Sequence, residues 1–84
     1  MEEKEIGTIT HYFSKISVAL IQLADSLRPG DNIHVKGHTT DFAQQVESMQ
    51  IEHVVVPDGK PGEVVGIKVA QKVHPNDKVF KVTG

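Results

Sequence analysis

The stretch LRPGDNIHV, residues 27–35, contains the turn signature that decides the fold. Pro at the second turn position sets its own φ, Gly at the third accepts a positive φ, and the following acid leads into alternating apolar residues. KPGEVVGI at 60–67 and HPNDKVFKV at 74–82 have the same order, with Asn in place of Gly in the last. A phosphate-binding loop would lead into a helix N-terminus. Three turns that each lead into a strand pattern instead favour a mainly β domain.

Several short segments have the residue pattern of β-strands. They are EIGTITHYF (5–13), NIHVK (32–36), VVGIKV (64–69) and KVFKV (78–82). Side chains alternate between the two faces of a strand, so Ile33 and Val35 are expected on a buried face. Likewise, Val79 and Phe80 are expected on opposite faces of the last strand.

Two segments fit a helix as well as a strand. In SKISVALIQLADSL (14–27), apolar residues recur at helical spacing, but they also fit a strand with apolar residues on both faces. In FAQQVESMQIEH (42–53), a helix competes with a strand that needs a β-bulge near Glu47 or Ser48. Local pattern therefore leaves two folds open, a closed six-stranded β-barrel and an α+β domain with helices near 14–27 and 41–50.

The length and composition indicate one small domain. The chain has 84 residues, 38% of them apolar, and no Trp. Such a chain either packs efficiently or buries surface against a partner or a second copy of itself, so a homo-oligomer fits. The net charge of −2 argues against binding nucleic acid by charge alone. We divide the chain into a charged N-terminal end, 1–5, and a single β-barrel domain, 6–82.

Location and redox chemistry follow from what the sequence lacks. It contains no cysteine, which excludes disulfides and thiolate chemistry. No basic segment followed by an apolar run opens the chain, and no stretch approaches the roughly 18 apolar residues of a membrane span. We expect a cytoplasmic protein with no membrane partner.

Read together, five stretches make the chain resemble a known family over residues 6–82. They are the strand that opens at Gly7, LRPGD.I.V (27–35), VESMQ (46–50), KPGEVVGIKV (60–69) and NDKVFKV (76–82). In order and spacing they resemble domain 2, the β-barrel of elongation factor Tu and other translational GTPases. The chain is similar to the same degree to the barrel at the C-terminal end of collagenase-type peptidases.

The resemblance implies strands in both ambiguous segments, and therefore an all-β closed six-stranded barrel. It does not extend to GTP hydrolysis, because the sequence has no G-x-x-x-x-G-K-[ST] motif. It does not extend to peptide hydrolysis either, because in the peptidases the barrel is an appendage to a separate catalytic domain. We therefore expect a stand-alone, non-catalytic, translation elongation factor-like barrel.

The elongation factor resemblance implies binding of tRNA or ribosome-associated RNA, including ribosomal RNA. Cationic and stacking side chains suited to RNA lie along the chain. They are His11, Tyr12, Lys15, His34, Lys36, His38 and Lys68, with Lys81 as a further cation. The alternative is a protein-interaction module that acts in trans with a larger enzyme and has no role with nucleic acid.

Catalytic and metal sites are not expected, and no cofactor is implied. His34 and His38 have the i, i+4 spacing of a zinc site on a helix, with Asp41 as a third candidate ligand. His34 is predicted on a strand, however, and His38 in a turn beyond a Gly, so they would not share a face. No Ser lies in a G-x-S-x-G motif. We predict no enzymatic activity.

Overall fold

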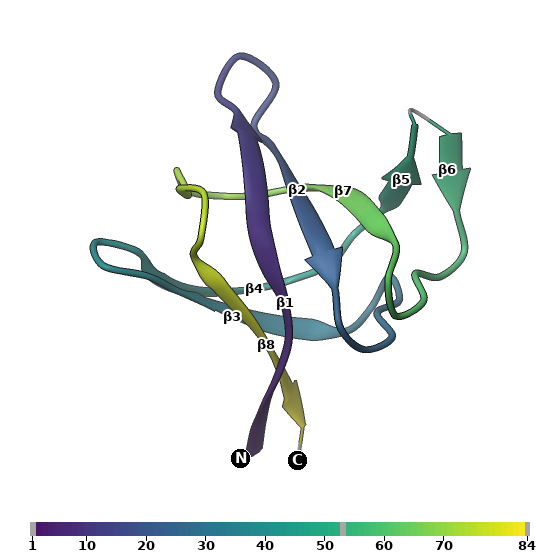
Figure 1. Cartoon of the computed structure of the whole chain (residues 1–84), viewed down its shortest axis with the longest axis horizontal. Coiled ribbons are helices and arrows are strands. Elements are labelled where there is room, and N and C mark those ends of the chain that lie inside the picture. The colour runs from purple at the N-terminus through teal and green to yellow at the C-terminus, as the bar shows by residue number, and fades with distance from the viewer. Residues whose placement is uncertain (1, 53, 84) are drawn as a thin grey trace.

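The computed structural model describes residues 2–52 and 54–83, and all of its regular elements are β-strands (Figure 1). The strands are β1 (Glu2–Phe13), β2 (Val18–Leu23), β3 (Asn32–Lys36), β4 (Asp41–Gln45), β5 (Met49–Ile51), β6 (Val54–Val56), β7 (Val64–Lys68) and β8 (Lys78–Thr83). The all-β prediction is confirmed. The two segments that could have been helices form β2, β4 and β5, with a break at 46–48 where a bulge was expected.

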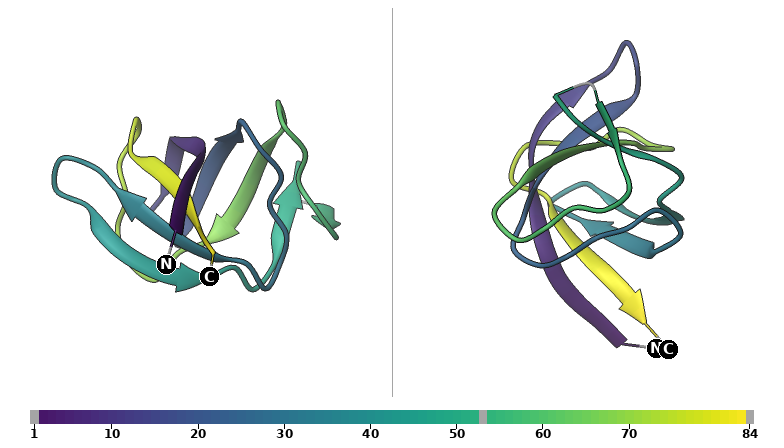
Figure 2. Two further views of the ribbon diagram at one scale, coloured as in Figure 1. Left: turned by 90° about the horizontal axis from the view of Figure 1, so that it is seen from below. Right: turned by 90° about the vertical axis from the view of Figure 1, so that its right-hand side faces the viewer.

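The strands form one antiparallel sheet in the order β4-β3-β8-β1-β2-β7-β5-β6. Figure 2 shows this sheet curling around one of its faces. Residues 2–5, which the sequence set apart as a charged end, belong to β1 and pair with β8 from Glu2 opposite Thr83. The long strand β1 pairs with β8 on one side and β2 on the other. Its register shifts at Ile6 against β8 and at Thr10 against β2. Such bulges bend a strand and increase its twist.

The prediction of a closed six-stranded barrel is wrong. In the part of the chain that the structure describes, β4 and β6 are the two edges of an eight-stranded sheet and do not pair. The backbone of Val46, just after β4, bonds to the turn at Gly30 and Asp31 instead. A side chain spans the remaining distance to the end of β7. Gln44 donates to the Lys68 carbonyl at 2.8 Å and accepts from the Ala70 N–H at 2.7 Å.

The apolar core lies on the inner face of the curled sheet. It contains Ile6, Ile9, Ala19, Ile21, Leu23, Leu27, Ile33, Val35, Phe42, Val46, Met49, Val65, Ile67, Val69, Val73 and Val79. The predicted burial of Ile33, Val35 and Val79 is confirmed, and Phe80 faces the other way with partial exposure. Alternate residues of β2, β3 and β7 supply much of this core, as expected for strands with one buried face.

The three Pro-containing turns have the same hydrogen bonds. In the first turn the Asp31 N–H donates to the Arg28 carbonyl at 3.1 Å, and the Asp31 carboxylate accepts from the Arg28 N–H at 3.0 Å. The third position has a positive φ in each turn, 96° at Gly30, 90° at Gly62 and 77° at Asn76. These are type II turns, in which the acid satisfies a backbone donor that the turn leaves free. We call them the three corners: Arg28–Asp31, Lys60–Glu63 and His74–Asp77.

Each corner also pairs with one buried residue of another strand segment. The Gly30 N–H donates to the Val46 carbonyl at 2.7 Å, and the Val46 N–H donates to the Asp31 carbonyl at 2.9 Å. The second corner has the same two-way exchange with Leu23, at 2.8 and 2.8 Å. The third corner has it with Ile9, also at 2.8 and 2.8 Å. The corners therefore attach the starts of β3, β7 and β8 to the core.

On the outer face, His34 of β3 lies between two carboxylates. Its Nδ1 is 2.6 Å from Glu3 Oε2 of β1, and its Nε2 contacts the Asp41 carboxylate of β4. Lys36 Nζ lies 3.3 Å from Glu3 Oε1 and 5.6 Å from the centre of the Phe80 ring. We call these residues, Glu3, His34, Lys36 and Asp41, the ionic cluster. The cluster connects the N-terminal part of β1 to β3 and β4 across β8.

The ionic cluster shifts the acidity of its members. The hydrogen bond to Asp41, and then the one to Glu3, raise the pKa of His34 above its ordinary value of 6.5. The hydrogen bond to His34 lowers the pKa of Glu3 below 4.5 and that of Asp41 below 3.8. The charged forms of all three groups are therefore favoured together in the folded protein.

Replacing the glycine at the third position of a corner will destabilise the fold. Gly30→Ala and Gly62→Ala should each lower the free energy of unfolding by about 1–2 kcal/mol, because an L side chain is strained at these φ values. A Cβ at either position would have no atom within 4 Å, so the cost is conformational and not steric. Urea denaturation followed by circular dichroism measures the change. Asn76→Gly is the matched control and should be close to neutral; Ala variants as stable as the original chain would contradict this account.

Stability should depend on the ionic cluster most strongly in mildly acidic solution. The contribution of His34 is fully present below pH 6.5 and is lost as the pH rises through its raised pKa. The contributions of Glu3 and Asp41 are present above pH 4.5 and 3.8 and are lost as the pH falls through their lowered pKa values. His34→Gln should therefore lower the thermal unfolding midpoint more at about pH 5.5 than at about pH 9.

The control for this measurement is His11→Gln, because the His11 ring nitrogen Nδ1 contacts the Thr10 carbonyl at 2.9 Å and not a carboxylate. The pH dependence that His34→Gln produces in the midpoint is read against that of His11→Gln. A difference between His34→Gln and the original chain that does not change with pH would show that the cluster is not ionised as described.

Candidate functional site

The residues predicted to bind RNA do not form one surface. His11 and Tyr12 lie at the end of β1, His34 and Lys36 lie on β3, and Lys68 ends β7. In the sheet, β8, β1 and β2 separate β3 from β7. Lys15 and His38 lie in the turns that follow β1 and β3. The structure thus brings His34 and Lys36 together, whereas Lys68 lies beyond β4, where its carbonyl accepts from the Gln44 side chain.

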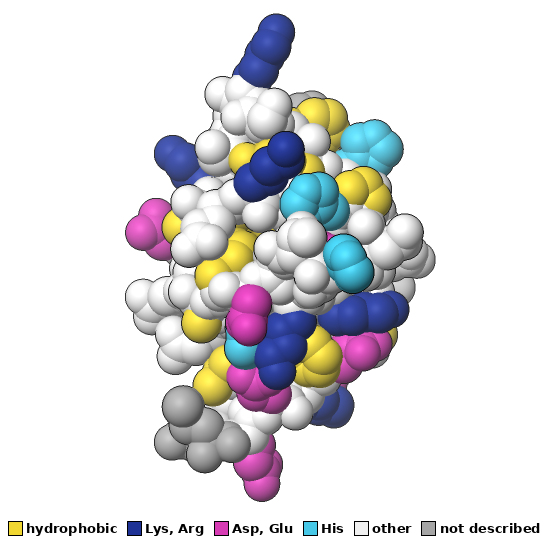
Figure 3. All heavy atoms as spheres, turned by 90° about the vertical axis from the view of Figure 1, so that its left-hand side faces the viewer, with side chains coloured by type: hydrophobic (Ala, Val, Ile, Leu, Met, Phe, Trp, Pro, Cys, Tyr) yellow, Lys and Arg dark blue, Asp and Glu magenta, His cyan; other side chains and the backbone are white. Residues whose placement is uncertain are grey.

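Acidic partners accompany several of the predicted cations. The ionic cluster surrounds His34 and Lys36 with the carboxylates of Glu3 and Asp41. Lys81, the further cation, lies 3.5 Å from Asp31. Figure 3 shows blue and magenta side chains next to one another on this face. Such a mixed surface lacks the basic stripe with which proteins bind nucleic acid backbones.

The described residues include one arrangement that resembles a catalytic triad, and the sequence did not point to it. His74 Nδ1 lies 3.3 Å from Thr40 Oγ1 and 3.8 Å from Asp77 Oδ2. A catalytic histidine uses one ring nitrogen for the nucleophile and the other for the acid. Here the same nitrogen faces both groups, and Thr40 is 5% exposed. The Asp77 carboxylate also accepts from the His74 backbone N–H at 2.9 Å. The arrangement therefore belongs to the third corner.

The candidate zinc ligands His34, His38 and Asp41 do not form a three-ligand site. Within residues 2–52 and 54–83, no group of three or more His, Asp or Glu side chains could hold a metal ion. The Asp41 carboxylate contacts His34, as part of the ionic cluster. In the same ranges, no helix is long and apolar enough to cross a membrane. The cytoplasmic location stays a prediction.

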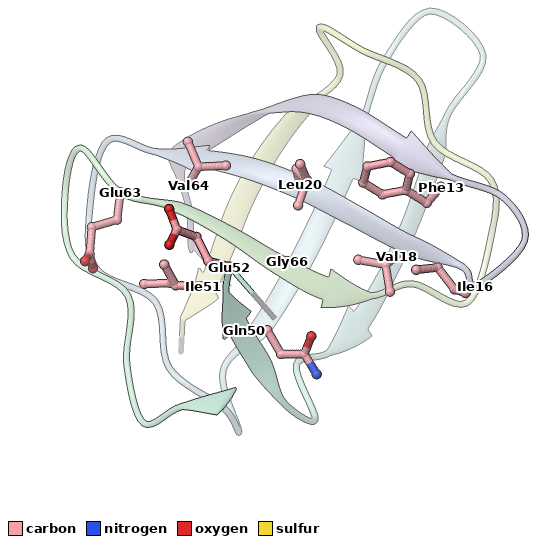
Figure 4. Close-up of a pocket in the computed structure, with 10 residues that line it drawn as sticks. All are labelled: Phe13, Ile16, Val18, Leu20, Gln50, Ile51, Glu52, Glu63, Val64 and Gly66. Carbon is pink, nitrogen blue, oxygen red and sulfur yellow. The ribbon is translucent and has the colours of Figure 1, made fainter. Parts of the chain in front are cut away.

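The most distinct surface feature is an apolar groove of about 430 Å³ on the outer face of the sheet (Figure 4). Its walls come from the ends of β1 and β2 on one side and from β5 and β7 on the other. Its apolar lining residues are Phe13, Ile16, Val18, Leu20, Ile51 and Val64. Three of these are large and exposed, Phe13 at 42%, Ile16 at 58% and Val64 at 42%. Apolar patches of this kind often mark binding sites for other molecules.

Gly66 lies at the floor of the groove. It lies on β7 between Val64 and Lys68 and pairs with Leu20 on one side and Gln50 on the other. A Cβ at Gly66 would lie 3.4 Å from the side chains of Leu20 and Val18, which is ordinary contact. A side chain would therefore fit at this position and would fill the floor of the groove. Gly66 is nevertheless buried, with the side chains of Leu20 and Val18 close to it.

Sequence analysis did not find the groove. The apolar residues of β2 were expected to be buried on both faces, but only Ala19, Ile21 and Leu23 are buried in the core. Val18 and Leu20, on the other face, are partly exposed and line the groove. The apolar residues on both faces of β2 were the sequence signal that could have indicated the groove. Which of its faces another element covers depends on the tertiary arrangement.

The comparisons with known proteins concern proteases. No protein-family model matches the sequence. The chain is 42% identical over 77 residues to an uncharacterized protease of Methanocaldococcus jannaschii, and 33% identical over 78 residues to a collagenase of Porphyromonas gingivalis. Each match covers 90% of this chain but only 19% and 22% of the two relatives. The chain thus spans about a fifth of the length of the curated relatives it matches.

Two solved structures with the same fold are of one peptidase domain. The C-terminal domain of a Geobacillus thermoleovorans protein assigned to the U32 peptidases superposes with a TM-score of 0.90 at 23% identity, covering 95% of this chain and 93% of that one. Its selenomethionine variant gives a TM-score of 0.87 over 90% of this chain and 96% of that one, also at 23% identity. At this identity the likeness shows the fold alone.

These findings correct the functional prediction. The translation elongation factor-like function, with tRNA or ribosomal RNA as a partner, is wrong, because the relatives are proteases. The likeness to domain 2 of elongation factor Tu is not supported, whereas the link to collagenase-type peptidases is confirmed. The chain is therefore related in sequence to one segment of such proteases, and it has the fold of a C-terminal domain from a protein assigned to the U32 peptidases.

Proposed function

We propose that this chain is a non-catalytic accessory domain of a collagenase-type protease, which acts by binding the larger catalytic polypeptide. The observation that carries this proposal is the extent of the sequence match. A relative named as a protease matches 90% of this chain at 42% identity, yet the match occupies 19% of that relative. The remaining four-fifths of such a protein has ample length for a separate catalytic domain.

The side chains of the domain support a non-catalytic role. Both ring nitrogens of His34 contact carboxylates, so neither is free to activate a nucleophile. His74 faces Thr40 and Asp77 with a single nitrogen. His34 and His74 thus serve the ionic cluster and the third corner, both of which hold strands together.

The outer face supports a binding role. A domain of this size with 38% apolar residues has little apolar material to spare. Even so, Phe13, Ile16 and Val64 remain exposed around the groove. Covering them against another polypeptide would release ordered water and add to affinity. The larger protein partner, expected as the alternative to RNA, fits this surface.

The proposal can be tested by complementation in trans. The Methanocaldococcus protease would be produced without the segment that matches this chain, and the purified chain would be titrated into it by isothermal calorimetry. We expect binding with a dissociation constant on the order of 1–10 μM. The reason is that this chain can occupy the surface on the protease that the deleted segment covered. Full-length protease is the matched control and should bind far more weakly, since its own segment occupies the surface.

The second readout is hydrolysis. The isolated chain should leave gelatin and a fluorogenic peptide mixture intact over many hours. Hydrolysis that persists when contaminating proteases have been removed from the preparation would overturn the non-catalytic role. Equal binding to the truncated and full-length proteases, or binding to neither, would overturn the docking role.

A further inference from the structure

The groove has two chemically different ends. Figure 4 shows Glu52 and Glu63 near Val64 at one end, and Phe13 and Ile16 near Val18 at the other. The charged residues that line the groove are both acidic. Glu63 is fixed by the second corner, where its Oε1 accepts from the Lys60 N–H at 2.7 Å. We call these the acidic end and the apolar end.

The register of β2 and β7 sets the distance between the two ends. Val64 pairs with Gln22 at the acidic end, and Lys68 pairs with Val18 at the apolar end. Strands rise by about 3.3 Å per residue, so the four steps from Val64 to Lys68 span roughly 13 Å. An extended peptide covers that distance with about four residues.

Lys68 does not line the groove, but it pairs with Val18 at the apolar end and gives the groove a direction. It lies on the same face of β7 as Val64 and Gly66, because alternate residues of a strand share a face. A cation on a bound peptide would therefore be attracted to Glu52 and Glu63 and repelled at the end next to Lys68. Opposite charges at the two ends favour one orientation of the occupant.

We propose that the groove binds an extended segment of a partner polypeptide, with a Lys or Arg at the acidic end and a large apolar side chain about four residues away at the apolar end. The apolar side chain packs against Phe13, Ile16 and Val18, and the intervening backbone passes over Gly66. Gly66 is itself buried, with the side chains of Val18 and Leu20 close to it, so the backbone of the bound segment contacts those two side chains as it passes. Identification of the partner as the catalytic polypeptide rests on the proposed function, but the chemistry of the segment does not.

The test uses the whole chain and short synthetic peptides. The first peptide, Thr-Arg-Ser-Thr-Ser-Leu-Thr-Ser with blocked ends, has the proposed spacing. Titrated into isotopically labelled protein, it should shift the amide signals of Leu20, Gln50 and Gly66 with a dissociation constant on the order of 0.5 mM. A peptide with Glu in place of Arg should bind about tenfold more weakly. A peptide with Ser in place of Leu should bind at least as poorly.

Three variants of the chain separate the groove from the rest of the surface. Gly66→Val fills the floor and should abolish the shifts, and Phe13→Ser removes an exposed side chain of the apolar end and should weaken binding about fivefold. Val55→Ser is the matched control, because Val55 is 67% exposed but does not line the groove. It should bind the peptide as the original chain does. Circular dichroism melts confirm that each variant is folded, and Phe13→Ser keeps the test valid if Gly66→Val does not fold.

Several outcomes would overturn this inference. Absence of shifts at millimolar peptide would do so, as would equal affinity for the Arg and Glu peptides. Shifts centred outside the groove would also count against it, and so would concentration-dependent dimerisation of the chain through the groove. The failure of this test and that of the proposed function can be told apart. If the Gly66→Val variant still binds the truncated protease, the groove is not the binding site, but the proposed accessory role is retained.

Discussion

The two-way backbone hydrogen bonds between the three corners and the buried residues Ile9, Leu23 and Val46 set the geometry of this domain. A corner can bond in this way only with a positive φ at its third position, so that its N–H and the following carbonyl face the same residue. The three exchanges fix where β3, β7 and β8 begin. They therefore determine how far the sheet curls, and the apolar side chains of the core lie inside the curled sheet.

The hydrogen bonds of the first corner also explain why the two edges of the sheet do not pair. The residue after β4, Val46, uses both of its backbone groups on the first corner. It is therefore unavailable to pair with β5 or β7, and the Gln44 side chain makes the connection to Lys68 and Ala70. A side-chain bridge satisfies polar groups at a sheet edge without extending the ladder, which is one way to protect an edge strand.

Outside the curl, the surface divides into two regions with different roles. The ionic cluster connects β1, β3 and β4, and its charges compensate one another. The groove lies on the other side of β1, where β2 and β7 present apolar side chains that no further strand covers among residues 2–52 and 54–83. In an accessory domain of a protease, the compensated region would face water and the groove would face the partner. A cluster of cations and histidines in a sequence is therefore a poor guide to function when carboxylates from other strands can reach it.

The sequence by itself determined the parts of the fold that depend on local chemistry. The order of Pro, Gly or Asn, and acid specifies a type II turn wherever it occurs, and alternation in NIHVK and KVFKV correctly indicated the inner faces of β3 and β8. It also carried the likeness to collagenase-type peptidases, although the translation-factor likeness led to the wrong function. Only the tertiary structure decided that the sheet stays open, that Glu3 and Asp41 meet His34, and that the outer face of β2 borders a groove. Each of these depends on contacts between residues far apart in the chain, and local pattern holds no information on which distant strand lies next to a given side chain.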